Sequence, residues 1–287
     1  IRKQFRNVCG QRKRRNHGGC PKCDSKRLRF RSSYNAKSHV SAWLFCFFEV
    51  MKPMADLPRF YLPNAQLGSI SEIETEEAKH ARVLRLTEGS IVHLIDGKGK
   101  LFEASVLKAG KKMEVSIDQI VEEEASHANR LILAVAPTKN MARFEWVIEK
   151  AVEVGVDEIH PLKCEHSERV FIKADRLLRI ALSAAKQSKA LHMPIIHELT
   201  SIDEALNIVA EKKWIAHCKP SNKSAILELS KSNCSQLICI GPEGDFSQSE
   251  IDAALAKGFK SLSLGEKRLR TETAAIASII AANVFQA

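Results

Sequence analysis

Short apolar runs alternate with amphipathic stretches from about residue 130 to the end of the chain. Residues 131–136 form an unbroken apolar run of strand length. Residues 141–154 repeat apolar positions at helical spacing and stop before Gly155, a residue type favoured just past a helix end. Strands alternating with helices predict an α/β domain, a parallel sheet with helices on both faces. Further strands are expected at 158–162, 195–198, 214–217, 236–240 and 262–264, and further helices at 175–189, 203–211, 247–257 and 271–285.

Residues 59–124 show a different pattern, dominated by short strands. The segment Asp96-Gly97-Lys98-Gly99 is a strong hairpin signal between two of them. Several hairpins in so short a stretch predict a compact β-barrel. Strands are expected at 60–62, 90–95, 101–108 and 113–121, with one helix at 76–86. We therefore divide the chain into a basic extension (1–53), a small β-barrel domain (54–125) and an α/β domain (130–287).

The net charge of +10 is unevenly distributed. Residues 1–53 hold 14 of the 44 Lys and Arg residues but 2 of the 34 Asp and Glu residues, a net charge of +12. The rest of the chain therefore carries a net charge of −2. Any affinity for nucleic acid in the two domains must come from a local basic patch and not from an overall positive field.

The first 53 residues show little helical or strand periodicity. Cys20-Pro21-Lys22-Cys23 has the spacing of half a zinc knuckle, but a zinc site needs four converging ligands, and the other two would be chosen arbitrarily. We therefore expect a disordered basic tail, or sequence that precedes the true start, with Met54 as the functional start. Deleting residues 1–53 is expected to leave stability and activity intact.

The cysteines after Met54 occur singly, without the spacing of a disulfide framework: Cys164, Cys218, Cys234 and Cys239. They are typical of reduced thiols in a cytosolic protein. No stretch approaches the roughly 20 apolar residues that span a bilayer. We expect a soluble, cytoplasmic protein without a membrane partner.

Two glycine-containing loops follow two of the expected strands. Residues 241–247 read G-P-E-G-D-F-S, and residues 264–274 read L-G-E-K-R-L-R-T-E-T-A. Ligands of open α/β sheets bind beyond the carboxyl ends of the strands, so we expect both loops at one binding edge. Gly241, Gly244 and Gly265 would let a flat ligand lie against bare backbone. Neither loop has the Gly-Lys-Ser/Thr sequence of a P-loop, which excludes that kind of phosphate cradle.

Together these two motifs resemble the SPOUT-class methyltransferases, and most closely the RsmE-type enzymes, which methylate N3 of a uridine in small-subunit (16S) ribosomal RNA. Supporting residues are spread over the chain after Met54: Arg59-Phe60-Tyr61, His80, Val83-Leu84-Arg85, Gly89, Asp96-Gly97, Lys139, Arg143, Glu145-Trp146, Lys150, Glu153, Gly155-Val156, Ser167-Glu168-Arg169 and Gln187-Ser188. The resemblance implies a PUA-like barrel that grips RNA, followed by an α/β domain with a trefoil knot, a rare feature that periodicity does not reveal. It also implies a homodimer that uses S-adenosylmethionine (SAM) and needs no metal.

The resemblance assigns roles to residues of the two loops. Arg270 is expected to stabilise the negative charge that develops as N3 of the uracil loses its proton. Glu243 or Glu272 would orient the base or accept that proton, although Glu272 could instead be a first-turn helix carboxylate. His217 is either a cofactor contact or a histidine of the core. The cofactor would otherwise contact Gly241, Pro242, Glu243, Gly244, Leu264, Gly265 and Leu269, mostly through their backbone.

RNA contacts are expected from both domains, and each of these residues taken alone could be a solvated charge. The set is Arg59, Arg82, Arg85, Lys139, Arg143, Arg169 and Arg268. Lys139 and Arg143 are one helical turn apart, which places them on one face. Such a set forms a phosphate track whose binding weakens with salt, and the uridine would be unstacked into the site.

Two departures from the family pattern stand out. Asp245 replaces a more usual second glycine, a change expected to be tolerated at the edge of the loop. Lys189 and Ala190 replace a glycine and an arginine, so Lys186 or Lys189 would have to bind RNA in place of that arginine.

Two other functions remain open. One is a SPOUT ribose 2′-O-methyltransferase acting on ribosomal or transfer RNA. The barrel and the motif R-L-R-T-E-T-A argue against this function. The other is an RNA-binding assembly factor that has lost catalysis, against which the intact Gly241, Gly265, Arg270 and Glu272 argue.

Overall fold

The computed structural model describes residues 57–73, 75–110, 112–125, 129–230 and 234–284. The expectations for residues 1–53, including the zinc knuckle and the start at Met54, lie outside the described residues. None of the helices in the described part of the chain combines the length and the apolar character that crossing a bilayer requires.

The first described region is a five-stranded sheet. Its strands are β1 (Arg59–Tyr61), β2 (Ile70–Ile73), β3 (Ile91–Ile95), β4 (Lys100–Lys108) and β5 (Met113–Glu123), and α2 (Thr75–Val83) follows β2. The strand order is β1-β3-β4-β5-β2, with β1 parallel to β3 and the other pairs antiparallel. Phe60, Leu94 and Val115 share the core of this sheet with Ala78 of α2.

The five-stranded sheet is curled, as the expectation of a PUA-like barrel requires. The pairing of β4 with β5 shifts register at three places, and such irregularities bend and twist a strand pair. Among the described residues the edge strands β1 and β2 do not pair with each other, so the hydrogen-bonded ladder stays open. The sequence did not predict β2, because I-S-E-I has only two apolar residues and no turn signal of its own.

The second region contains a parallel sheet, as predicted. Its strand order is β11-β13-β10-β12-β6-β7-β8, with β9 paired to β7, and each of these pairs is parallel. The strands are β6 (Leu131–Val135), β7 (Glu158–Lys163), β8 (Ile195–Ile196), β9 (Thr200–Ser201), β10 (Lys212–Ala216), β11 (Ser224–Ala225), β12 (Gln236–Ile240) and β13 (Lys260–Ser263).

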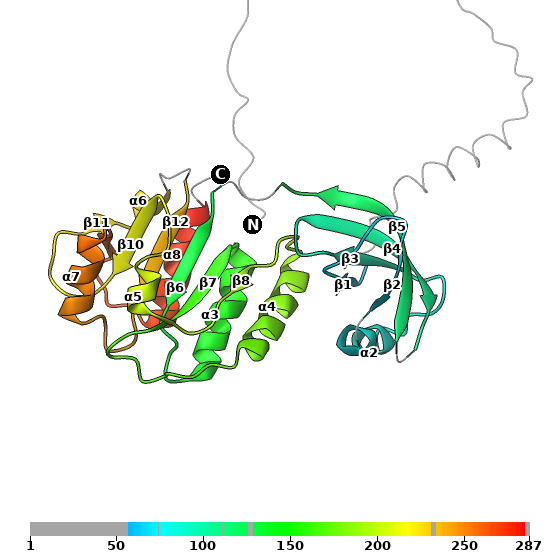
Figure 1. Ribbon diagram of the computed structural model, residues 1–287, viewed down its shortest axis with the longest axis horizontal. Coiled ribbons are helices and arrows are strands. Elements are labelled where there is room, and N and C mark those ends of the chain that lie inside the picture. The colour runs from blue at the N-terminus through cyan, green and yellow to red at the C-terminus, as the bar shows by residue number, and fades with distance from the viewer. Residues whose placement is uncertain (1–56, 74, 111, 126–128, 231–233, 285–287) are drawn as a thin grey trace, which may run out of the picture. The chain divides into compact units, whose positions relative to one another are not determined.

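Helices cover both faces of the parallel sheet, which confirms the doubly covered arrangement. Leu133 of β6 packs in one core with α3 (Met141–Val154), α4 (Ala174–Ser188), α6 (Leu227–Ser230) and α8 (Thr271–Val284). Its neighbour Ile132 points to the other core, with α5 (Ile202–Ala205) and α7 (Gln248–Ala256). The alternation of side chains along a strand therefore serves two cores at once, and Figure 1 shows the helices that cover the sheet.

Helix ends follow local sequence signals. The side chain of Asn140 caps α3, and Gly155 ends it with a φ of 96°, the left-handed conformation that glycine tolerates. Ser247 and Glu250 form the predicted capping box of α7. The helix expected at 203–211 was predicted too long, because α5 ends at Ala205.

Candidate active site

Three loops meet at the carboxyl ends of the neighbouring strands β13, β10 and β12. They follow β10 (from His217), β12 (from Gly241) and β13 (from Leu264), and together with the start of α8 they enclose a cavity of about 510 Å³. This edge is where open α/β sheets bind their ligands, and the volume suits a small molecule of cofactor size. The prediction that the two glycine-containing loops lie side by side is confirmed.

The cavity brings together most of the sequence-predicted cofactor residues. Arg268 and Arg270 also line the cavity, on the loop before α8. Gly244 and Glu272 are absent from the lining, so these two candidates lie beside the cavity rather than on it. The predicted cofactor residues that line it are His217, Gly241, Pro242, Glu243, Leu264, Gly265 and Leu269.

Two of the glycines are needed for local structure. A Cβ on Gly241 would lie 3.0 Å from Cδ2 of Phe246, so a side chain there would press on the buried ring. Gly265 has a φ of +128°, a conformation that residues with a Cβ rarely adopt, while the space around its Cα is open. The backbone at Gly265 is thus left accessible to a ligand.

Gly244, a predicted cofactor contact, lies where the loop after β12 meets the loop after β7. A Cβ on Gly244 would lie 2.9 Å from Cβ of His166, in the loop after β7. The ring Nδ1 of His166 lies 3.0 Å from the carbonyl oxygen of Asp245. The glycine therefore allows the loop after β7 to pack against the loop after β12.

Asp245 links two of the cavity loops, a role that the sequence did not indicate. Its φ is 65°, a left-handed conformation that explains why glycine is the more usual residue there. The Oδ2 atom accepts a hydrogen bond of 2.8 Å from the backbone N–H of Cys218, and Oδ1 accepts one of 2.9 Å from that of Phe246. The carboxylate thus ties the loop after β10 to the loop after β12.

Thr271 fixes the start of α8 to the same loop. Its buried hydroxyl donates a hydrogen bond of 3.0 Å to the carbonyl oxygen of Gly241. The contact places the loop that carries Arg270 next to the loop that carries Glu243.

The two candidate catalytic carboxylates have different surroundings. Oε1 of Glu243 accepts a hydrogen bond of 3.0 Å from the backbone N–H of Lys139, which directs this exposed side chain toward the start of α3. Oε1 of Glu272 lies 3.8 Å from Nη1 of Arg143, and the Glu272 side chain is only 13% exposed. Glu272 is therefore placed to hold Arg143, which itself is a candidate RNA contact.

His217 fits both of its sequence interpretations. It lines the cavity, yet it is buried, and its Nε2 lies 3.0 Å from the hydroxyl oxygen of Ser261 on β13. Burial, helped by the positive charge of Lys223, lowers the pKa of His217, so the ring is neutral at neutral pH. The Lys223 ammonium group, which the sequence did not single out, also lines the cavity and donates a hydrogen bond of 2.6 Å to the carbonyl oxygen of His217.

The candidate RNA-binding residues form separate groups. Nη2 of Arg169 donates a hydrogen bond of 2.8 Å to the carbonyl oxygen of Lys139, whose ammonium group pairs with Glu168 at 2.7 Å. With Arg143 at the opening of α3, these residues gather beside the cavity loops.

The arginines of the first sheet lie on different elements. Arg82 is exposed in the last turn of α2, and Arg85 is exposed just beyond it. Nη1 of Arg59 donates a hydrogen bond of 3.0 Å to the carbonyl oxygen of Lys189 at the end of α4, so part of this guanidinium is already engaged within the protein.

Comparisons with known proteins agree with this geometry. Residues 123–283 match the family of RNA methyltransferase domains, and residues 73–115 match the family of RNA methyltransferase PUA domains. The chain is 31% identical over 229 residues to the ribosomal RNA small subunit methyltransferase E of Rickettsia conorii, covering 77% of this chain and 93% of that protein.

Two solved structures share the fold. A candidate rRNA methyltransferase from Porphyromonas gingivalis is 39% identical, with a TM-score of 0.71 and coverage of 80% of this chain and 98% of that one. A ribosomal RNA small subunit methyltransferase E from Neisseria gonorrhoeae, solved with bound S-adenosylmethionine, is 27% identical, with a TM-score of 0.66 and coverage of 78% and 96%. The chain therefore belongs to the RNA methyltransferase family that includes the ribosomal RNA small subunit methyltransferases E.

Proposed function

We propose that this protein transfers the methyl group of SAM to N3 of a specific uridine in 16S ribosomal RNA. The observation that carries the proposal is the cavity formed by the two motif loops, at the sheet edge where a nucleoside-bearing cofactor would bind. The relative from Neisseria gonorrhoeae was solved with SAM bound, and relatives of this chain carry the name of small-subunit ribosomal RNA methyltransferases.

The residues present fit SAM. Open space at Gly265 lets the flat adenine approach the backbone, and Pro242, Leu264 and Leu269 provide apolar lining. Lys223 offers a cation to the carboxylate of the methionine part. SAM supplies the electrophilic methyl group, and the protein's own residues must position the base and manage its proton.

Arg270 is the residue that we assign to the developing charge. N3 of uridine carries a hydrogen and becomes a nucleophile as that proton leaves, which puts negative charge on the neighbouring carbonyl oxygens. A guanidinium that lines the cavity can donate to such an oxygen through fixed N–H groups. Glu243, the candidate carboxylate on the cavity lining, is the better placed proton acceptor, whereas Glu272 positions Arg143.

RNA would contact the basic groups beside the cavity and on the first sheet. Lys139, Arg143 and Arg169 lie beside the motif loops, and Arg268 lies on one of them. Arg82 and Arg85 are exposed near the end of α2. Contacts of this kind are to phosphates and make binding dependent on salt.

The larger assembly is also part of the proposal. We propose that a PUA-like RNA-binding domain (54–125) precedes a trefoil-knotted catalytic domain (130–287). We further propose that the protein acts as a homodimer in the cytoplasm, on 16S ribosomal RNA within the small ribosomal subunit.

The test is methylation of unmodified small ribosomal subunits by the full-length protein with labelled SAM, followed by nucleoside mass spectrometry. We expect N3-methyluridine, and a loss of the rate by about 100-fold or more in Arg270→Ala, because one preorganised donor to the developing charge is removed. SAM affinity, measured by calorimetry, should change little in that variant. Lys267→Ala is the matched control, since it removes a positive charge from the same exposed loop without an assigned role.

Other products would contradict the proposal. A labelled 2′-O-methyl nucleoside would mean a ribose methyltransferase with the same fold. SAM binding without any methylated nucleoside would favour a non-catalytic RNA-binding factor.

A further inference from the structure

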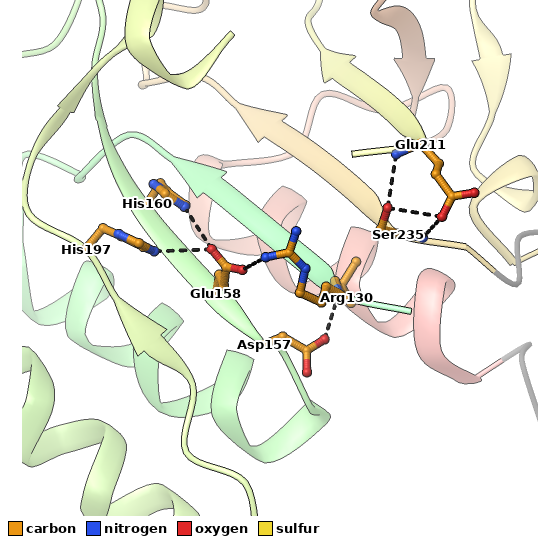
Figure 2. Close-up of polar contacts among 8 residues, drawn as sticks. Arg130, Asp157, Glu158, His160, His197, Glu211 and Ser235 are labelled. Atoms are coloured by element: carbon orange, nitrogen blue, oxygen red, sulfur yellow. Dashed lines mark hydrogen bonds and ion pairs between the residues drawn. The ribbon is translucent and has the colours of Figure 1, made fainter. Parts of the chain in front are cut away.

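A second group of chemically active side chains lies on β7 and just after β8, outside the cavity lining. Glu158 and His160 are the first and third residues of β7, so both point to the same face of the sheet. His197 follows β8, the neighbouring strand, and its backbone N–H donates a hydrogen bond of 2.9 Å to the carbonyl oxygen of Ile159. Figure 2 shows both imidazole rings directed at the Glu158 carboxylate.

The two distances from the Glu158 carboxylate to the histidine rings match those between ligands of a metal site. Oε2 of Glu158 lies 3.4 Å from Nε2 of His160 and 3.2 Å from Nε2 of His197. All three ligand atoms lie within 4.8 Å of one another. Tetrahedral zinc with bonds of about 2.0–2.1 Å separates its ligand atoms by roughly 3.3–3.4 Å, and two histidines with one glutamate form a known zinc ligand set.

The Glu158 carboxylate presents one of its two oxygens to the two histidine rings. Nη1 of Arg130 pairs with Oε1 at 2.6 Å, which leaves Oε2 facing the two rings (Figure 2).

One rearrangement is required. The two rings are stacked, with centroids 3.7 Å apart and planes 12° apart, whereas a metal lies close to the plane of each ring that binds it. The rings must therefore splay. His197 is the ligand with room to turn, because its side chain is 36% exposed while that of His160 is 9% exposed.

We propose that Glu158, His160 and His197 bind one divalent transition-metal ion of the zinc type, with water completing the coordination. The role is structural. β8 pairs with β7 through only two residue pairs, and β9 resumes the pairing with β7 at Leu162. The segment around His197 therefore lies between two short stretches of strand pairing. An ion bound by residues of β7 and by His197 stabilises this edge of the sheet, and this role is independent of methyl transfer.

The test uses the full-length protein, stripped of metal and titrated with Co²⁺, whose absorption spectrum reports the ligands. We expect the visible bands of a tetrahedral nitrogen and oxygen site, without the near-ultraviolet band of a thiolate bound to cobalt. The chain has eight cysteines, so the thiolate band separates this site from any cysteine site. His197→Ala should weaken the cobalt site by at least about 100-fold, since it removes one of three protein ligands.

A second readout guards against loss of folding in the variant. Zn²⁺ should raise the melting temperature of the wild-type protein and of His80→Ala, a control that removes an exposed histidine from α2, but not of His197→Ala. Circular dichroism without metal should be the same for all three proteins. Equal cobalt spectra for wild type and His197→Ala, or a wild-type protein that binds no Co²⁺ or Zn²⁺ at several times its own concentration, would overturn the proposal.

Discussion

At the carboxyl ends of β10, β12 and β13 the protein presents a cavity formed by loops, whereas on β7 and around it the protein presents a cluster of interacting side chains. The cavity edge relies on glycines, a proline and two loop-to-loop hydrogen bonds, from Asp245 and Thr271. The cluster instead joins Arg130 and Glu158 to His160 and His197, and Ser235 and Glu211 bond each other just before β12 and β10 (Figure 2).

The two sites differ in how far the sequence alone predicts them. A cavity formed by loops depends on residues that are consecutive in the chain, so its loops appear as two contiguous motifs. A side-chain cluster depends on residues brought together by strand pairing, and His197 stands 37 positions after His160. The first kind of site is visible before the fold is known, and the second kind is visible only afterwards.

The largest expected effect comes from placing a side chain on a glycine of the cavity loops. Gly265→Val should abolish SAM binding in calorimetry, because valine disfavours a φ of +128° and its methyl groups would enter the open space beside the loop. The fold and the metal response at Glu158 should survive, which would establish that the two edges act separately.

Gly258→Val is the matched control for that change. Gly258 also has a positive φ, of +82°, and a Cβ added there would meet no heavy atom within 4 Å, but it lies between α7 and β13 and does not line the cavity. The Gly258→Val variant should lose stability through backbone strain but keep its SAM binding. If both variants lost SAM binding equally, strain and not the lining of the cavity would be the cause.

An intermediate effect is expected from the loop link. Asp245→Ala removes the acceptor for the Cys218 N–H and should weaken SAM binding by about 10-fold, the usual scale for losing a hydrogen bond to a charged group. Asp245→Gly loses the same acceptor but relieves the left-handed strain at a φ of 65°. It should therefore be more stable than Asp245→Ala in thermal unfolding, with a similar loss of affinity. Wild-type affinity in both would refute the role of the link.

The smallest effect concerns pH. The pKa of His217 is lowered in the folded protein, so the unfolded chain binds more protons as the pH falls through the ordinary histidine range. The His217 contribution to stability is therefore present at neutral pH and lost on acidification. The melting temperature should fall by roughly 1–3 °C more between pH 7.5 and 5.5 for wild type than for His217→Asn. Parallel curves would mean that His217 keeps its ordinary pKa.

Much of the fold could be predicted because its signals are local. The bounds of α3 and β12 agree with prediction, since an asparagine cap, a terminal glycine and an unbroken apolar run mark them. The two-residue strands β9 and β11 were missed, because their pairing is supplied by β7 and β13 and not by their own composition. The helix expected at 203–211 was predicted too long, because apolar spacing alone does not show where packing stops.

The sequence motifs of the site could be predicted, but the hydrogen bonds between its loops could not. The sequence placed Gly241, Gly265 and Arg270 at one edge, and the cavity contains all three. From the sequence, Asp245 was predicted to be a tolerated departure at the edge of the loop. Nothing in the motif shows that its carboxylate accepts a hydrogen bond from Cys218, 27 positions away in the chain. Lys223 was missed because a lone lysine after a strand is usually a solvated charge.

The attachment of α8 has a consequence for how the protein matures on the ribosome. Thr271 and the rest of this helix complete both the cavity and the core shared with α3, and the side-chain amide of Asn283 closes on the carbonyl oxygens of Val154 and Gly155. These residues are translated after all the strands of the parallel sheet. A nascent chain therefore cannot form the complete SAM cavity until α8 has been translated.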